Sequence, residues 1–431
     1  MEEIRLEMQK VQRALLVGIQ DSSLNRLEAE DHLAELASLA DTMGVTVAGS
    51  LIARLDRPSP KYYLGQGKVD EINALAYAEE ADVLIFDADL SPSQQRNWEE
   101  LTKIAVIDRQ EVILDIFASR ARTKEARLQV GLARMEYSLP RLHRAWSHLE
   151  RQRGGAGLRG GPGELQLEVD RRVAVDRIRR FKRQLAEVRK QREVQRKGRK
   201  GRPVPTAAIV GYTNAGKSSL LKALTGAEVF IEDKLFATLD TTTRRLLLGN
   251  NQPLLLTDTV GFIRKLPHKL VEAFKATLEE AAQADFLVNV LDVTQPKIEE
   301  HYAVTNQVLV ELGARDKLTI LVLNKIDQEH DPFLLARFRR LNPLCHAVST
   351  RTGEGLEELK AAFARHFVVP LRRATLRLPL DRYDLVSLLH REGEIHDQRH
   401  EADGVWIKAD FPLRYERLLE AFMVDRAHPK P

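Results

Sequence analysis

Two glycines, a lysine and a serine stand at fixed spacing in residues 211 to 218, which read Gly-Tyr-Thr-Asn-Ala-Gly-Lys-Ser. This is the G-x-x-x-x-G-K-S pattern of a loop that binds phosphate groups. The glycines let the backbone bend until its N–H groups point at phosphate oxygens. The lysine places a positive charge on the β- and γ-phosphates, and the serine hydroxyl can ligate Mg²⁺. The expected phosphate-binding residues are Gly211, Tyr212, Thr213, Asn214, Ala215, Gly216, Lys217 and Ser218.

A second pattern, D-x-x-G, occupies Asp258, Thr259, Val260 and Gly261. A carboxylate at this position can hold Mg²⁺ through water. The backbone N–H of the glycine can bind a γ-phosphate and release it after hydrolysis. The two motifs together predict a site that cleaves a nucleoside triphosphate.

A third pattern, N-K-x-D, follows further along the chain and can choose the base. Its aspartate can accept two hydrogen bonds from the N1–H and N2–H₂ edge of guanine, whereas adenine lacks that pair of donors. The order of the three motifs therefore favours GTP over ATP. The expected base-binding residues are Asn324, Lys325, Ile326 and Asp327, with Ser349, Thr350 and Arg351 in a last loop that closes over the base.

Between the first two motifs, residues 236 to 240 read Phe-Ala-Thr-Leu-Asp. A threonine here can complete the Mg²⁺ shell only when a γ-phosphate is present, so the segment orders with GTP and loosens with GDP. The spacing favours Thr238, while the threonines at 241 to 243 can instead form a strand edge. The expected metal ligands are Ser218 and Thr238, the expected catalytic residues are Lys217, Thr238 and Gly261, and the further nucleotide-binding residues are Phe236, Ala237, Thr238, Leu239 and Asp240.

The residue after the D-x-x-G motif bears on the rate of hydrolysis. Phe262 follows the D-x-x-G glycine, where many GTPases place a glutamine that orients the attacking water. Because a phenyl ring cannot orient water by hydrogen bonding, we expect slow basal hydrolysis. Asn214 offers one form of compensation, since its amide oxygen can ligate K⁺ beside the phosphates. The alternative is that Asn214 only stabilises the loop through backbone hydrogen bonds.

Apolar runs place these motifs on a sheet. Residues 206–210, 253–257 and 318–323 predict buried strands, and residues 218–224 predict the start of a helix. The first ~120 residues alternate strand-like and helix-like segments, which predicts a small parallel α/β sheet. The Gly-Gln-Gly-Lys at 65–68 predicts a turn and helix start rather than a second nucleotide site.

Two long helical segments, 123–151 and 164–197, enclose a loop at 154–163 with six glycines in ten residues. Residues 171–202 carry fifteen Lys or Arg against three acidic residues, a density typical of nucleic-acid contact or of a solvated helix face. We expect a helical hairpin whose basic tip contacts RNA, the alternative being a passive linker. The expected RNA-binding residues are Arg151, Arg153 and Arg159.

The expected fold class is α/β, with a P-loop GTPase domain and a small α+β domain at the C-terminal end. The role of that last domain is not legible in the sequence. The expected domains are 1–122 (small parallel α/β), 123–203 (helical hairpin with the glycine-rich tip), 204–368 (GTPase) and 369–431 (small α+β).

The motifs and their flanks resemble the HflX family of GTPases of the translation-factor class over about residues 10 to 365. The matching segments include 236–240 with Thr-Thr-Arg-Arg at 242–245, and Asp-Thr-Val-Gly-Phe-Ile-Arg-Lys-Leu-Pro at 258–267. Thr241 departs from the family, which usually has proline there. Further matching segments are Leu-Gly-Gln-Gly-Lys at 64–68, Leu-Ser-Pro-Ser-Gln-Gln-Arg-Asn at 90–97, Val-Ile-Asp-Arg at 106–109, and 154–163 with the helix after it.

The resemblance implies a protein that binds ribosomes, chiefly the large subunit and its RNA, and that splits or rescues stalled or idle ribosomes. In that case the ribosome itself can order Thr238 and the segment after Gly261 for hydrolysis. Two other hypotheses are an RNA-binding GTP switch in ribosomal subunit assembly and a membrane-linked signalling GTPase. No lipidation motif or membrane segment supports the last one.

The composition of the chain indicates the cellular compartment in which the protein acts. The chain has 431 residues, a formal net charge of +4, 43% hydrophobic residues and one cysteine, Cys345. A single cysteine forms no internal disulfide and excludes cysteine-based zinc fingers, which favours a reducing compartment. No apolar run approaches ~18 residues and the N-terminus lacks a signal pattern, so we expect a cytoplasmic protein. We also expect a monomer that binds GTP or GDP with Mg²⁺.

Overall fold

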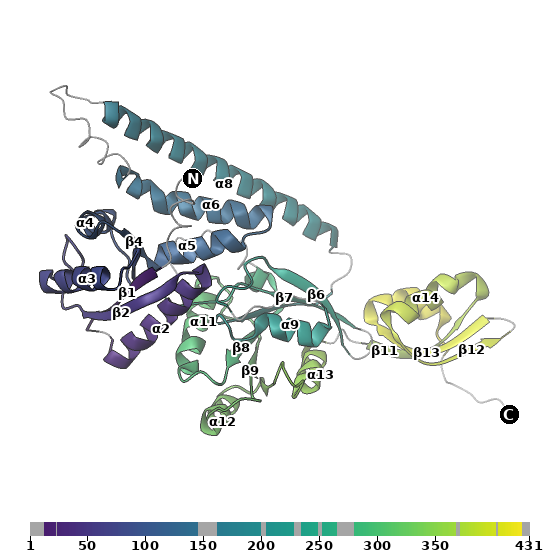
Figure 1. Ribbon diagram of the computed structural model, residues 1–431. Helices are drawn as coiled ribbons and strands as arrows, with labels where there is room; N and C mark the ends of the chain where they lie inside the picture. The colour runs from purple at the N-terminus through teal and green to yellow at the C-terminus, as the bar shows by residue number, and fades with distance from the viewer. Residues whose placement is uncertain are drawn as a thin grey trace. The chain divides into compact units, whose positions relative to one another are not determined.

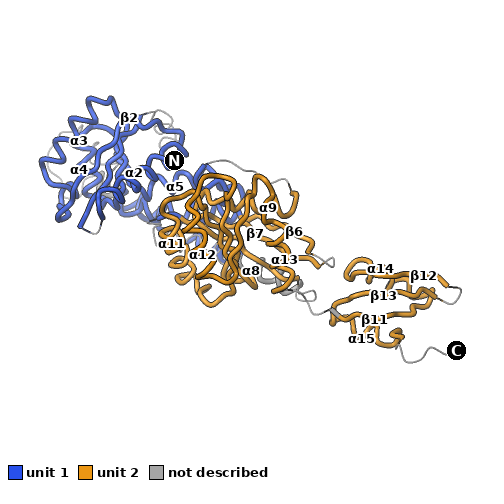
Figure 2. The backbone as a smooth tube through the Cα atoms, turned by 90° about the horizontal axis from the view of Figure 1, so that it is seen from below, with its two compact units in different colours: residues 1–200, 232–240, 263–278 blue, residues 201–231, 241–262, 279–431 orange. Residues whose placement is uncertain are grey.

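The computed structural model describes residues 13–22, 24–144, 162–199, 204–227, 234–248, 252–264, 280–367, 371–401 and 404–424. The chain divides into two compact units (Figure 2). The first contains residues 1–200, 232–240 and 263–278, and the second contains 201–231, 241–262 and 279–431. Within the described residues, no helix is both long and apolar enough to cross a membrane.

The first unit begins with a four-stranded sheet in the order β2-β1-β3-β4, and all its strands are parallel. The predicted alternation of strands and helices is confirmed, and Gly65 caps the helix predicted near it. The elements are β1 (Arg13–Gln20), α2 (Arg26–Met43), β2 (Thr46–Arg54), α3 (Gln66–Ala78), β3 (Val83–Phe86), α4 (Pro92–Thr102), β4 (Ala105–Asp108) and α5 (Arg109–Arg120).

Two helices of the same unit lie side by side (Figure 1): α6 (Lys124–Ser138) and α8 (Pro162–Arg199). Leu128 and Leu132 of α6 pack with Leu185 of α8. The prediction of one helix over 123–151 is wrong at 139–144, because α6 gives way there to the 3₁₀ segment η1 (Leu139–Arg144), and residues 145–151 lie outside the described residues. Pro140 explains the change, since it lacks an N–H and clashes with the carbonyl four residues before it.

The polar groups at the base of this helix pair are buried together. Arg141 stacks on the ring of Tyr137, and its guanidinium lies 3.2 Å from a carboxylate oxygen of Asp108. Burial raises the pKa of Asp108 to about 6, even though the Glu111 N–H and Arg141 both favour the charged form. Arg151, Arg153 and Arg159 lie outside the described residues, as does the predicted tip at 154–163 except for its last two residues, which belong to α8.

The second unit contains a six-stranded sheet in the order β10-β9-β8-β5-β7-β6, with β6 antiparallel to β7. Thr242 and Thr243 lie in β6, as the strand-edge interpretation expected. The elements are β5 (Thr206–Gly211), α9 (Lys217–Thr225), β6 (Thr242–Leu247), β7 (Pro253–Asp258), β8 (Phe286–Asp292), α11 (Ile298–Glu311), β9 (Thr319–Asn324), α12 (Pro332–Leu341), β10 (Cys345–Ala347) and α13 (Leu356–Phe367).

The same unit ends in a three-stranded antiparallel sheet in the order β11-β13-β12. One face of it packs Leu376, Ile407 and Phe411 against Leu385 and Leu389 of α14. The mixture of parallel sheets, a P-loop domain and a small α+β region confirms the expected fold class. The elements are β11 (Leu371–Leu378), η3 (Leu380–Arg382), α14 (Tyr383–Glu392), β12 (Glu394–Glu401), β13 (Gly404–Pro412), η4 (Leu413–Tyr415), α15 (Glu416–Leu419) and η5 (Glu420–Phe422).

Candidate nucleotide-binding site

The predicted phosphate loop connects the end of β5 to the start of α9, and both of its glycines are sterically required. A Cβ on Gly211, whose φ is +142°, would lie 2.3 Å from the carbonyl oxygen of Val290. A Cβ on Gly216, with φ +92°, would lie 2.2 Å from the side-chain nitrogen of Asn324. The loop therefore follows a path that only glycine allows, with the N-terminus of α9 at its end.

The amine of Lys217 and the hydroxyl of Ser218 are both fixed by contacts within the protein. Lys217 is buried and donates a hydrogen bond to the carbonyl oxygen of Tyr212, 2.7 Å away. Burial lowers the pKa of Lys217 to about 8, while nearby Asp258 acts in the opposite direction. The Ser218 hydroxyl lies 2.6 Å from a carboxylate oxygen of Asp258. Hydroxyl and carboxylate oxygens are the ligands that Mg²⁺ prefers, so this pair fits the expected ion.

The D-x-x-G segment leaves β7 and contacts the phosphate loop. A Cβ on Gly261 would lie 2.9 Å from both the Lys217 amine and Thr213, so a side chain has no room there. The Thr259 hydroxyl donates to the carbonyl oxygen of Ile209. The structure thus brings Asp258, Thr259 and Gly261 together with the phosphate loop.

Phe262 is almost wholly buried, and its backbone is bonded to the phosphate loop. Its N–H donates to the Gly211 carbonyl at 3.0 Å, and its own carbonyl accepts from the Thr213 N–H at 2.8 Å. The side chain is apolar and enclosed, and it offers no group that orients water. Asn214, by contrast, is exposed and has φ +60°, a left-handed conformation that asparagine adopts more readily than most residues.

The predicted base-binding residues also come together. The Asn324 amide donates to the Ala215 carbonyl at 3.0 Å, and its oxygen accepts from the Thr350 N–H at 3.2 Å. The Ser349 hydroxyl donates to Asp327 at 2.7 Å and orients its carboxylate. One side of Asp327 is thus fixed by protein, which prepares the carboxylate to accept hydrogen bonds from a base. Arg351 is mostly exposed and lies 4.0 Å from the same carboxylate, a weak contact.

The sequence interpretation missed two contacts at this site. Lys325 has φ +69°, and its amine lies 2.6 Å from the Asp292 carboxylate at the end of β8. The ring of Tyr212 stacks on His301 of α11 with a centroid distance of 3.8 Å and nearly parallel planes. An aspartate at the carboxyl end of a central parallel strand was a usable signal for the first contact. Nothing in the local sequence points to the second.

Two residues of the segment with the proposed metal-binding threonine contact helices of the first unit. Phe236 is buried edge-on against Phe117, and Asp240 accepts hydrogen bonds from the N–H groups of Arg122 and Thr123. The sequence had predicted nucleotide contacts for Phe236 and Asp240. Within the protein, their partners are the end of α5 and the start of α6, with Thr238 between them in the chain, and the predicted nucleotide contacts stay a prediction.

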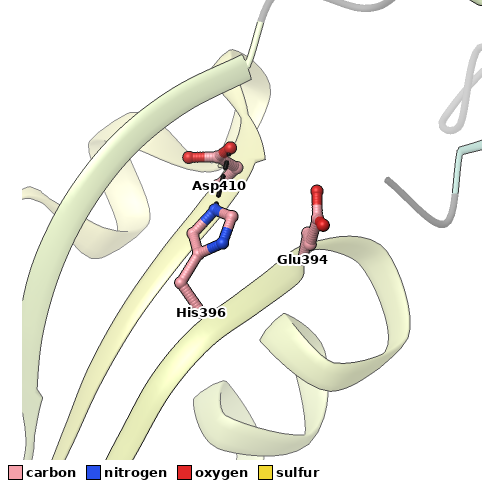
Figure 3. Close-up of side chains that lie close together, drawn as sticks. All are labelled: Glu394, His396 and Asp410. Carbon is pink, nitrogen blue, oxygen red and sulfur yellow. Dashed lines mark ion pairs between the residues drawn. The ribbon is translucent and has the colours of Figure 1, made fainter. Parts of the chain in front are cut away.

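A further group of possible metal ligands, Glu394, His396 and Asp410, lies on the last sheet (Figure 3). A bulge in β12 between Ile395 and Asp397 turns His396 toward Asp410, and the two side chains are 3.0 Å apart. Arg373 already binds both Asp410 oxygens, at 2.7 and 2.8 Å. Hydrogen bonding to Arg373 is the main cause that lowers the pKa of Asp410 to about 2. We interpret the group as an ion-pair network, because a guanidinium compensates the carboxylate.

Comparisons with known proteins identify relatives along most of this chain. Residues 30–118 match the family model described as GTP-binding GTPase N-terminal, 120–199 match GTP-binding GTPase Middle Region, and 206–325 match 50S ribosome-binding GTPase. The GTPase HflX of Akkermansia muciniphila is 48% identical, covering 98% of this chain and all of that protein. The chain belongs to the HflX family. The GTPase HflX of Escherichia coli K12 is 43% identical, over 91% of this chain and 92% of that protein.

Among solved structures, a GTP-binding protein of Sulfolobus solfataricus in complex with GDP is 25% identical and covers 82% of this chain and 98% of its own, with a TM-score of 0.44. Membership of the HflX family confirms that the protein is a GTPase, and with it the GTP hydrolysis that the three motifs predicted. It also assigns residues 206–325 to a GTPase domain of the ribosome-binding type.

Proposed function

We propose that this HflX-family GTPase binds the large ribosomal subunit through RNA, and that its nucleotide state governs splitting or rescue of stalled or idle ribosomes. The observation that carries the proposal is the match of residues 206–325 to a 50S ribosome-binding GTPase, in a chain that also carries a long basic helix. The described part of α8 supports RNA contact through its exposed basic residues. They are Arg171, Arg172, Arg177, Arg179, Arg180, Lys182, Arg183 and Lys190.

The chemistry follows from the residues of the site. Mg²⁺ supplies charge neutralisation on the phosphates when bound, with Ser218 and Thr238 as its proposed ligands and Asp258 acting through water. Lys217 would exchange its bond with the Tyr212 carbonyl for phosphate oxygens, which restores the charged form that burial disfavours. The Gly261 N–H would meet the γ-phosphate while water attacks in line.

We propose that the carboxylate of Asp327, which follows β9, selects the base. Asp327, oriented by Ser349, would receive the two donors of guanine. A nucleotide with adenine would leave this carboxylate facing a ring nitrogen that accepts and does not donate. We therefore propose GTP and GDP as the ligands in preference to adenine nucleotides.

Sedimentation of ribosomes with the full-length protein tests the ribosomal role. In the presence of a non-hydrolysable GTP analogue, we expect the protein to move with the large subunit and the 70S peak to decrease, whereas GDP gives weak binding. Stimulation of GTP turnover by ribosomes is expected as well. Binding only to immature subunits, without loss of 70S particles, would favour the alternative of a GTP switch in subunit assembly.

The proposed RNA contact through Arg151, Arg153 and Arg159 has its own test. Replacing all three by alanine, or deleting residues 154–163, should weaken sedimentation with ribosomes at low salt while GTP affinity stays unchanged. The difference from the wild-type protein should shrink as salt rises, because contacts with phosphate are screened. Full binding by the triple variant at low salt would contradict this role. The matched control replaces Arg26, Arg54 and Lys68 by alanine. These are exposed cations of the region that contains the first sheet, and their loss should leave ribosome binding unchanged.

A further inference from the structure

The N-terminus of α6 is capped by two side chains, one of which comes from far along the chain. The Thr123 hydroxyl accepts a hydrogen bond from the Ala126 N–H at 3.1 Å, which is an ordinary N-cap. The Asp240 carboxylate accepts from the Arg122 N–H at 2.9 Å and the Thr123 N–H at 3.1 Å, and also from the Thr123 hydroxyl. A carboxylate at this point satisfies N–H donors and lies at the positive end of the helix dipole.

A second anchor lies four residues before Asp240. Phe236 is buried to 2% exposure and meets the Phe117 ring edge-on, with a centroid distance of 4.6 Å. Its φ is +54°, a left-handed conformation that is unfavourable for a bulky side chain. Such a conformation persists only where the surroundings impose it, and here the burial against α5 does so.

Thr238 stands midway between these anchors. Because a residue extends the chain by at most ~3.6 Å, the Cα of Thr238 lies within about 7 Å of the Cα atoms of both Phe236 and Asp240. The positions that Thr238 can take are therefore limited by the contact of Phe236 with α5 and by the contact of Asp240 with the start of α6.

The segment that follows the D-x-x-G motif is attached to the same unit. Arg264 is buried, and its carbonyl oxygen accepts from the Arg109 guanidinium at 3.1 Å. The Arg264 guanidinium lies 3.4 Å from Glu35 of α2. Residues 236–240 and Arg264, which lie next to nucleotide motifs in the chain, thus both contact helices of the first unit.

We propose that Asp240, through the α6 N-terminus, and Phe117, through Phe236, are positioning residues that hold Thr238 for GTP hydrolysis. The proposal rests on the proposed role of Thr238 as a Mg²⁺ ligand. It also makes the start of α6 sensitive to the bound nucleotide, because a change in the conformation of residues 236–240 alters the hydrogen bonds that Asp240 makes at the cap. By reciprocity, a change at α6 alters the affinity for GTP relative to GDP.

Steady-state GTP hydrolysis by the full-length protein tests the positioning role. Asp240→Ala and Phe117→Ala should each lower kcat by roughly tenfold, because a displaced group no longer matches the transition state. Affinity for GDP should not change. Asp240→Asn, which keeps one acceptor oxygen, should recover part of the lost rate. Asn25→Ala is the matched control: it removes the capping box of α2 in the same unit and should leave kcat unchanged.

Hydrogen exchange provides a readout that a merely structural role would not change. In the wild-type protein, the amides of residues 124–127 should exchange at different rates with GDP and with a non-hydrolysable GTP analogue. This difference should vanish in Asp240→Ala. An identical exchange rate in the two nucleotide states of the wild-type protein would overturn the proposal.

Thr238→Ala separates this inference from the proposed function on which it rests. If Thr238→Ala leaves kcat unchanged, the role of Thr238 itself is wrong. If Thr238→Ala lowers kcat but Asp240→Ala and Phe117→Ala do not, only the positioning inference fails. A rise in kcat in the two anchor variants would also overturn it, because the anchors would then restrain Thr238 and not position it.

Discussion

The side-chain amide of Asn324 donates a hydrogen bond to the carbonyl oxygen of Ala215, 3.0 Å away, and so joins the base-binding motif to the phosphate loop. The same side chain accepts from the Thr350 N–H. One buried amide therefore joins three segments of the chain. The phosphate loop lies about a hundred residues or more before the other two. Its position also explains why Gly216 must be glycine, because a Cβ there would collide with it.

Replacing Asp327 by asparagine should change the preferred base. The substitution turns one acceptor oxygen into a donor that faces the donors of guanine. We expect the free energy of GTP binding to weaken by several kcal/mol, because leaving a buried polar group without a hydrogen-bond partner has a cost on that order. Affinity for xanthosine nucleotides should rise. Competition binding with GTP, ATP and XTP measures both changes. Equal affinity of the wild-type protein for GTP and ATP would refute the assignment.

Gly216→Ala should weaken nucleotide binding. The added Cβ would displace Asn324 and force a left-handed residue, and both effects disturb the phosphate loop. We expect GDP affinity to fall by roughly tenfold or more, corresponding to about 1.4 kcal/mol. Gly313→Ala is the matched control, since Gly313 has φ +70° but no atom within 4 Å of its Cβ position. Similar GDP binding by Gly216→Ala and Gly313→Ala would argue against the clash.

Asn214 decides between two explanations of how the absence of a catalytic glutamine is compensated. A K⁺ site would give faster hydrolysis in KCl than in NaCl at equal ionic strength without ribosomes, and Asn214→Ala would remove the difference. The exposed, left-handed Asn214 is compatible with this role and with a purely conformational one. Equal rates in the two salts would remove the cation hypothesis and leave ordering by the ribosome.

Ionisation of Asp108 should make the stability of the N-terminal sheet region depend on pH. Burial raises its pKa to about 6, so the folded state binds the proton more tightly than the unfolded chain does. The associated stabilisation is present below the unfolded pKa of about 4 and is lost as pH rises through about 6. A shift of this size corresponds to roughly 2 to 3 kcal/mol.

Asp108→Asn cannot ionise, so it provides the comparison. The stability of the wild-type protein relative to Asp108→Asn should fall as pH rises from about 4.5 to about 7. Hydrogen exchange of β4 and α5 amides at several pH values, corrected for intrinsic rates, measures the difference. A stability difference that is independent of pH would show that Asp108 keeps an ordinary pKa.

The sequence by itself determined the chemistry of the nucleotide site. Gly211, Gly216, Lys217, Asp258 and Asp327 were predicted as nucleotide-binding residues from spacing alone. Such a prediction is possible because each motif is a short strand–loop segment whose backbone path and function depend on residues next to one another. The strands that carry the motifs were equally clear, since buried parallel strands are uninterrupted apolar runs.

Only the tertiary structure decided the partners of side chains that meet across long sequence distances. Asp240 is an example: its motif predicts a nucleotide contact, and only the structure shows that its carboxylate also caps a helix that begins more than a hundred residues earlier. The stack of Tyr212 on His301 likewise had no signal in the local sequence, whereas the ion pair of Lys325 with Asp292 had one in the aspartate that ends a central strand. Such contacts are set by how whole elements pack, and a local pattern specifies the face that a residue occupies but not the residue that it meets.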